Sequence, residues 1–91
     1  MRQEDIKNNV IRDSHNNIIS ANGFNIGDYV VFDRSLGGYS DAIFLIEEYF
    51  EHTLLGNTRS YIKYDGGMAP IDDFFYSGGF RKATKLEIQN Y

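Results

Sequence analysis

The chain alternates short apolar bursts with polar, turn-forming segments, a pattern typical of a small β-rich protein. In the first 22 residues the apolar pairs Val10-Ile11 and Ile18-Ile19 flank Asp-Ser-His-Asn-Asn, whose short polar side chains favour a turn. We therefore predict a hairpin there. The alternative is a short helix over Gln3–Asp13, because Ile6 and Val10 are four residues apart. The neighbouring asparagines argue against a long helix and leave room for a frayed first turn before the hairpin.

Four later segments are rich in β-branched and aromatic residues and are expected to form strands: 24–33, 42–51, 59–65 and 80–83. The pair Gly56-Asn57 is a turn signal that joins the second and third of these into a hairpin. Along the third, alternation places Tyr61 and Lys63 on one face and Ile62 and Tyr64 on the other. Residues 71–76, which follow a proline, fit either a helical turn with acids at its positive end or a short strand.

The chain closes on a signal for a helix start. Thr84 is followed three residues later by Glu87, the spacing of a capping box in which each side chain accepts a hydrogen bond from the other's main-chain amide. We therefore expect a short C-terminal helical turn after the last strand. The fold class is mainly β, a small antiparallel, SH3-like bent barrel. It is one domain, with residues 1–22 as an N-terminal hairpin or short helix and residues 23–91 as the barrel.

Composition narrows the class of protein further. A chain of 91 residues with seven Phe and seven Tyr can bury one core without disulfides or metal. Because cysteine is absent, thiol nucleophiles and cysteine-based zinc sites are excluded. The longest uncharged apolar stretch, 42–46, is far too short to span a membrane, and no signal peptide is visible. We expect a cytoplasmic protein with no membrane association.

The formal net charge of −4 is distributed unevenly, with acids in the middle of the chain and Arg81, Lys82 and Lys85 near its end. Generic binding to nucleic acid requires clustered cations, so the acidic balance disfavours it. A partner with a basic surface suits this charge better, although surface charge also serves plain solubility.

Two motifs carry a resemblance to a known group of proteins. The segments Phe24-x-x-Gly27-Asp28-x-Val30 and Arg81-x-Ala83-Thr84-x-x-Glu87-Ile88 resemble short proteins of phages and mobile elements that have an early GDxV strand, an RxATxEEI-like ending and an SH3-like barrel between them. The resemblance covers residues 24–90. It implies an interaction protein that binds and modulates a host protein or ribonucleoprotein complex, as anti-defence and anti-CRISPR inhibitors do.

The chain also departs from that group. Lys85 and Leu86 stand where the group usually has Pro and Glu, so the first helical turn carries less negative charge. Residues 1–22 and 69–77 have no counterpart in the group and are where specificity is expected to lie.

Candidate catalytic and metal-binding residues are few. Asp13-x-His15 and His52 could join in acid-base work or metal binding, but no third ligand or nucleophile is spaced to join them. Adjacent acids such as Asp72 and Asp73 point in different directions on a strand or a helix. We interpret these residues as turn and first-turn residues, and expect neither catalysis nor a metal or other cofactor.

The surplus of tyrosines points instead to binding, because a core of this size cannot enclose all of them with their hydroxyl groups satisfied. For a protein partner, acids beside aromatic residues would provide electrostatic steering and buried anchors. The candidate contact residues are Tyr39, Glu47, Glu48, Tyr49 and Glu51.

Two alternatives remain open. A single-stranded nucleic-acid-binding module would stack bases on aromatic residues beside cations, using Arg59, Tyr61, Lys63, Tyr64, Arg81, Lys82 and Lys85. A small virion or assembly protein would instead form stable homo-oligomers.

Overall fold

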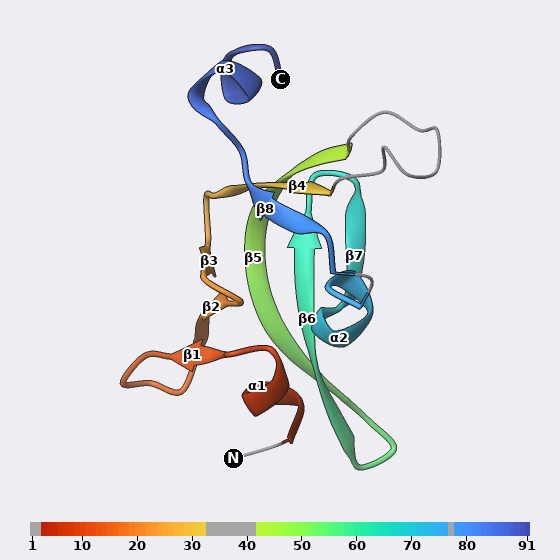
Figure 1. Cartoon of the computed structure of the whole chain (residues 1–91). Helices are drawn as coiled ribbons and strands as arrows, with labels where there is room; N and C mark the ends of the chain where they lie inside the picture. The colour runs from red at the N-terminus through yellow and green to blue at the C-terminus, as the bar shows by residue number, and fades with distance from the viewer. Residues whose placement is uncertain (1–2, 33–41, 77) are drawn as a thin grey trace.

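A computed structural model describes residues 3–32, 42–76 and 78–91 of the chain (Figure 1). It is mainly β, as the sequence predicts. In chain order the elements are α1 (Gln3–Lys7), β1 (Ile11–Arg12), β2 (Ile18–Ala21), β3 (Phe24–Asn25), β4 (Tyr29–Phe32), β5 (Ala42–Leu54), β6 (Asn57–Tyr64), β7 (Gly67–Pro70), α2 (Ile71–Phe74), β8 (Phe80–Lys82) and α3 (Lys85–Gln89).

The strands form two antiparallel sheets. The first has the order β1-β2-β3 and the second the order β7-β6-β5-β4-β8. Strand β5, 13 residues long, pairs with β4 through its first residues and with β6 through the rest. Figure 1 shows β5 bending strongly along this length, and the β5–β6 ribbon extends away from the other elements at its far end. The result is a small, bent, barrel-like arrangement.

One apolar core lies between the two sheets. Strand β2 packs against β5, and α2 adds the buried Ile71 beside β6 and β7. Ile18 and Ala21 belong to the same core as Val30 and Ile62, so residues before the Asn22-Gly23 turn help to build it. The buried members are Ile18, Ala21, Phe24, Val30, Phe32, Ile46, Tyr49, Ile62, Ile71 and Phe75.

The predicted N-terminal hairpin is confirmed, with a helical turn before it. α1 ends at Lys7, and Asn9 has a φ of +48°, which stops the helix well before Asp13. The loop between β1 and β2 is organised by Asp13, whose Oδ1 accepts hydrogen bonds from the main-chain amides of His15 and Asn17, both at 2.9 Å. These bonds lower the pKa of Asp13, the bond from Asn17 most.

Two segments differ from a simple strand pattern. The expected strand over 24–33 is divided into β3 and β4, because Asp28 Oδ2 accepts a hydrogen bond from the Asn25 amide at 2.8 Å and closes a turn between them. The segment 71–76, for which helix and strand were both open, begins as the short helix α2 with two acids in its first turn. Pro70 precedes it and has the extended backbone that a helix entry requires.

Two hairpins in the described residues have turns of the same length and backbone conformation but different sequences. Between β2 and β3 the turn is Asn22-Gly23, with φ values of +54° and +84°. Between β5 and β6 it is Leu55-Gly56, with φ values of +54° and +82°. Both central residues have positive φ, as a type I′ turn requires, and asparagine tolerates that conformation far better than leucine does. Leu55 is therefore strained where Asn22 is not.

Replacing Leu55 by asparagine should stabilise the protein. The side chain of Leu55 is 92% exposed, so little burial is lost. Relief of the left-handed conformation should raise the free energy of unfolding by about 1 kcal/mol. Urea denaturation of Leu55→Asn measures the gain. Leu54→Asn, in the strand beside the turn, is the matched control and should give no such gain; equal values for both variants would contradict strain at Leu55.

Candidate interaction surface

Residues from both the protein-contact set and the nucleic-acid set lie on the solvent-facing side of the two-stranded β5–β6 ribbon. In an antiparallel pair, residues directly opposite each other point to the same face. The register pairs Glu48 with Lys63, Phe50 with Tyr61 and His52 with Arg59. We call the side chains of Glu48, Phe50, His52, Leu54, Arg59, Tyr61 and Lys63 the outer hairpin face. On the neighbouring strand β7, Met68 pairs with Lys63 and Pro70 with Tyr61, so both extend this face.

An aromatic stack lies at the centre of the outer hairpin face. The rings of Phe50 and Tyr61 are 5.3 Å apart between centroids and nearly parallel, at 11°. His52 approaches the same tyrosine at 6.3 Å, edge to face. Phe50 and Tyr61 are both half-buried, whereas Arg59, Lys63 and Glu48 around them are exposed. An aromatic centre with a charged rim is an arrangement that protein–protein interfaces also have.

A bulge in β5 decides which residues reach this face. The register shifts between Ile46 and Glu48, so Glu47 is an extra residue with respect to β6. As a result Tyr49 points to the core together with Ile46. Tyr49 is 7% exposed, and its hydroxyl donates to the main-chain oxygen of Phe24 at 2.8 Å. Burial raises the pKa of Tyr49. The expectation that Tyr49 contacts a partner is wrong.

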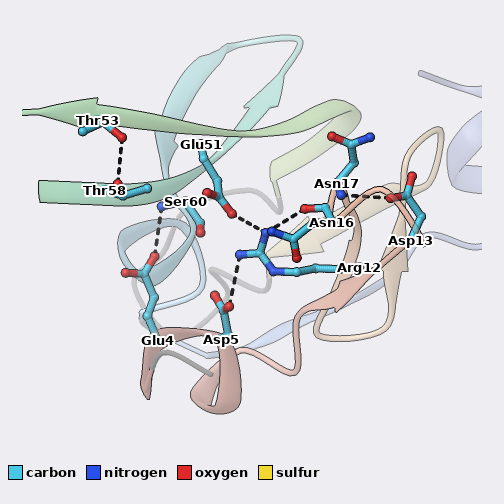
Figure 2. Close-up of polar contacts among 10 residues, drawn as sticks. All are labelled: Glu4, Asp5, Arg12, Asp13, Asn16, Asn17, Glu51, Thr53, Thr58 and Ser60. Carbon is cyan, nitrogen blue, oxygen red and sulfur yellow. Dashed lines mark hydrogen bonds and ion pairs between the residues drawn. The ribbon is translucent and has the colours of Figure 1, made fainter.

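Glu51 lies on the same side of β5 as Tyr49 but is exposed, and it belongs to an intramolecular ion-pair group (Figure 2). The Arg12 guanidinium lies between the carboxylates of Glu51 and Asp5, with Nη2 at 3.1 Å from Asp5 Oδ2, and its Nη1 donates to the main-chain oxygen of Asn16 at 3.0 Å. Burial alone would lower the pKa of Arg12, but the hydrogen bonds to Glu51 and Asp5 outweigh it and the pKa is raised. This Arg12 clamp makes Glu51 a structural residue.

The remaining residues of the protein-contact set differ in position. Glu48 is exposed on the outer hairpin face. Glu47 is exposed at the bulge, with its Oε1 3.9 Å from Lys63 Nζ. Tyr39 lies outside the described residues. Of the described residues in that set, Glu47, Glu48 and Glu51 are exposed and Tyr49 is buried; Glu48 shares the face of the stack.

The nucleic-acid set is divided between two faces and two ends of the molecule. The expected alternation along β6 is confirmed, so Tyr64 points away from Arg59, Tyr61 and Lys63. It packs on Phe44 and Phe74, at centroid distances of 5.0 and 4.9 Å. Several of the cations have carboxylate partners: Lys63 with Glu47, Lys82 with Asp28 at 3.6 Å and Arg81 with Glu87. Neutralised cations attract phosphates poorly.

The titratable side chains considered for metal binding or catalysis do not come together. No group of three or more His, Asp or Glu residues suited to a metal ion is found in the part of the chain that the structure describes. Asp72 Oδ1 accepts a hydrogen bond from the side-chain Nδ2 of Asn8 at 2.9 Å and lies 3.4 Å from Lys7 Nζ, and the bond from Asn8 most strongly lowers the pKa of Asp72. His15 lines a hollow of about 420 Å³ beside β5, together with Asn17 and Phe50.

The predicted helix cap is confirmed. The Thr84 hydroxyl accepts a hydrogen bond from the Glu87 amide at 3.2 Å, and Glu87 Oε1 accepts one from the Thr84 amide at 2.9 Å. Arg81 adds two parallel hydrogen bonds to Glu87, at 2.7 and 2.8 Å. These contacts, the bonds from Arg81 first, lower the pKa of Glu87 to about 2. Arg81, a residue of strand β8, therefore also stabilises the capped start of α3.

Comparison with protein-family models, with curated proteins and with solved structures finds no match to this chain. Among the described residues no helix is long and apolar enough to cross a membrane.

Sequence reasoning missed Phe50 and the two leucines at the ribbon's end. Phe50 carries no polar group, and the bulge that turns it outward leaves no mark in the sequence. Leu55, by contrast, had a signal: a leucine immediately before Gly56-Asn57 occupies a turn position where asparagine or aspartate is usual.

Removal of the Arg12 guanidinium should destabilise the fold strongly. Arg12→Met keeps most of the aliphatic stem but leaves the buried carboxylate of Asp5 without its ion pair. We expect a loss of about 3 kcal/mol in the free energy of unfolding. Lys63→Met, which removes an exposed ion pair, is the control and should change it by less than about 0.5 kcal/mol. Similar values for the two variants in urea denaturation would contradict a structural role for the clamp.

Acid should loosen α3. The pKa of Glu87 in the folded protein, about 2, is below its ordinary value of 4.5, so the ionised form is the one that stabilises the cap. Its contribution is complete above about pH 4.5 and is lost as the pH falls toward 2. Hydrogen exchange of the α3 amides should accelerate relative to the intrinsic rate over that range, and NMR titration gives the carboxyl pKa directly. Arg81→Gln should raise it; an unchanged value would contradict the assigned cause.

Proposed function

We propose that this chain is a non-enzymatic interaction protein that binds another protein, alone or within a ribonucleoprotein complex, through the outer hairpin face. The observation that carries this proposal is the half-buried Phe50–Tyr61 stack at the centre of the ribbon. Aromatic side chains at the centre of a surface patch contribute most to protein–protein affinity, because partner atoms exclude water from them on both sides.

The charges around the stack favour protein over nucleic acid as the partner. The rim carries both signs, with Glu48 opposite Lys63 and Arg59 opposite His52. A mixed rim selects a complementary protein surface, whereas a phosphate backbone requires an excess of cations. The resemblance to phage and mobile-element proteins would make the partner a host protein or ribonucleoprotein complex, whose activity the bound chain then modulates.

Loss of the stack should weaken partner capture. A tagged chain is used for pull-down from the lysate of its native host at low and at high salt, with mass spectrometry for proteins and sequencing for RNA. Tyr61→Ala removes the half-buried ring, and we expect the affinity for the recovered partner to fall by about 30-fold. Tyr76→Ala, at a tyrosine that is 81% exposed, is the matched control and should bind as the unmodified chain does.

The outcomes separate the candidate functions. A protein retained at high salt and lost with Tyr61→Ala supports the proposal. Nucleic acid alone, released as salt rises, would contradict it and favour the single-strand-binding alternative. Equal recovery by the Tyr61 and Tyr76 variants, each shown to be folded by circular dichroism, would place the contact elsewhere on the chain.

A further inference from the structure

The turn between β2 and β3 contains a chemically reactive pair of residues. Asn22 is the one asparagine of the chain that is followed by glycine. An asparagine in that position is prone to lose its side-chain amide, because glycine has no side chain to hinder attack by its own main-chain nitrogen. The same two residues form the turn itself, since both have positive φ. A reactive pair therefore lies in a turn that joins two strands of the core.

The reaction is the loss of ammonia from Asn22. The main-chain nitrogen of Gly23 gives up its proton and attacks Cγ of Asn22, which closes a five-membered ring. The Cγ–Nδ2 bond breaks, and the side-chain nitrogen leaves as ammonia. Water then opens the ring at either of its carbonyl groups. The product is aspartate or isoaspartate, and in isoaspartate the main chain runs through the side-chain carbons. Water is the only co-reactant.

The closed turn keeps the two reacting atoms apart. Asn22 has a φ of +54°, the left-handed conformation of a type I′ turn. In that conformation the nitrogen of the next residue points away from Cβ, so the Gly23 nitrogen cannot reach Cγ of Asn22. The ring forms only after the turn opens, so the rate of the reaction depends on how often the turn opens.

Asn8, the residue after α1, holds the turn closed. Its main-chain oxygen accepts a hydrogen bond from the Asn22 main-chain amide at 2.7 Å, and its Oδ1 accepts one from Nδ2 of Asn22 at 3.3 Å. Asn8 is buried, and its own Nδ2 donates to the main-chain oxygen of Glu4 at 3.1 Å and to Asp72 Oδ1 at 2.9 Å. One buried side chain thus ties the turn to α1 and α2.

Neither product fits the closed turn. Ala21 and Phe24 pair directly across the turn, and both belong to the core. Isoaspartate adds a carbon atom to the main chain between them, which disturbs the register of these two buried residues. Aspartate keeps the length of the main chain but places a carboxylate oxygen against Oδ1 of Asn8, whose Nδ2 already donates to other groups. Two acceptors then face each other where a hydrogen bond had been.

We propose that Asn22 is a latent deamidation site, which the fold protects through Asn8 and which reacts when the β2–β3 turn separates from α1. A chain that has opened and reacted cannot close the turn as before, so a reversible local opening becomes an irreversible loss of native structure. The site therefore limits the working lifetime of the protein. The reaction involves neither the outer hairpin face nor a partner, so it does not depend on the function proposed above.

Mass spectrometry of the peptide that contains Asn22 measures the reaction. The peptide gains one mass unit during incubation of the full chain at physiological temperature and mildly alkaline pH. The unmodified chain should react at least about tenfold faster in guanidinium chloride, which unfolds it, than in buffer. This comparison does not require any variant to fold. Asp65-Gly66 can form the same ring, but it loses no ammonia and adds no mass.

Three variants, each shown to be folded by circular dichroism, locate the protection. Asn8→Ala removes the side-chain contact with Asn22 and should react at least about fivefold faster in buffer than the unmodified chain, the factor expected for one hydrogen bond. Thr84→Ala removes the cap of α3 and is the matched control. It should react at the unmodified rate, because opening of the turn is local. Asn22→Gly should gain no mass in this peptide.

Three results would overturn the proposal. Equal rates in buffer and in guanidinium chloride would show that the fold gives no protection. An unchanged rate in a folded Asn8→Ala variant would remove Asn8 from the mechanism. Equal acceleration in Asn8→Ala and Thr84→Ala would show that the pair reacts only after global unfolding, and not when the turn separates from α1.

Discussion

The Arg12 clamp is the interaction on which the position of the ribbon depends. The two sheets described here have separate strand orders, so the core and a few polar contacts hold them together. Arg12 comes from β1, Asp5 from α1 and Glu51 from β5, so one guanidinium joins the small sheet, the first helix and the base of the ribbon (Figure 2). Asp5 is buried, and a buried carboxylate is tolerated only with such a partner.

Further contacts fix the ribbon beyond the clamp. Glu4 in α1 accepts a hydrogen bond from the Ser60 amide at 3.3 Å, and the hydroxyl groups of Thr53 and Thr58 share one at 2.7 Å (Figure 2). A two-stranded ribbon is marginally stable by itself, so these bonds and the Phe50–Tyr61 stack matter. They hold the outer hairpin face and the turn at the end of the ribbon in a defined orientation.

Much of the fold could be predicted from local chemistry. The N-terminal hairpin, the β5–β6 hairpin and the Thr84–Glu87 cap each depend on residues close together in the chain, where turn and capping preferences operate, although the β5–β6 turn is Leu55-Gly56, one residue before the predicted Gly56-Asn57. The candidate site depends on distant contacts and was predicted less well. Strict alternation of side chains along β5, counted from the buried Ile46, would place Tyr49 on the solvent-facing side. The bulge at Glu47 shifts the alternation by one residue and turns Tyr49 into the core. The pairing of Glu51 with Arg12 crosses 39 positions and leaves no local pattern.

The rigidity of the ribbon has a consequence for binding. Association costs free energy for every side chain that must be ordered at the interface, and a surface already fixed in the free protein avoids part of that cost. Phe50 and Tyr61 order each other by stacking, and the clamp at the base limits how the strands that carry them can move. Leu55 is exposed and has a strained backbone conformation in the free protein. The polar contacts at the base of the ribbon thus hold the partly exposed rings of Phe50 and Tyr61 in place before a partner binds.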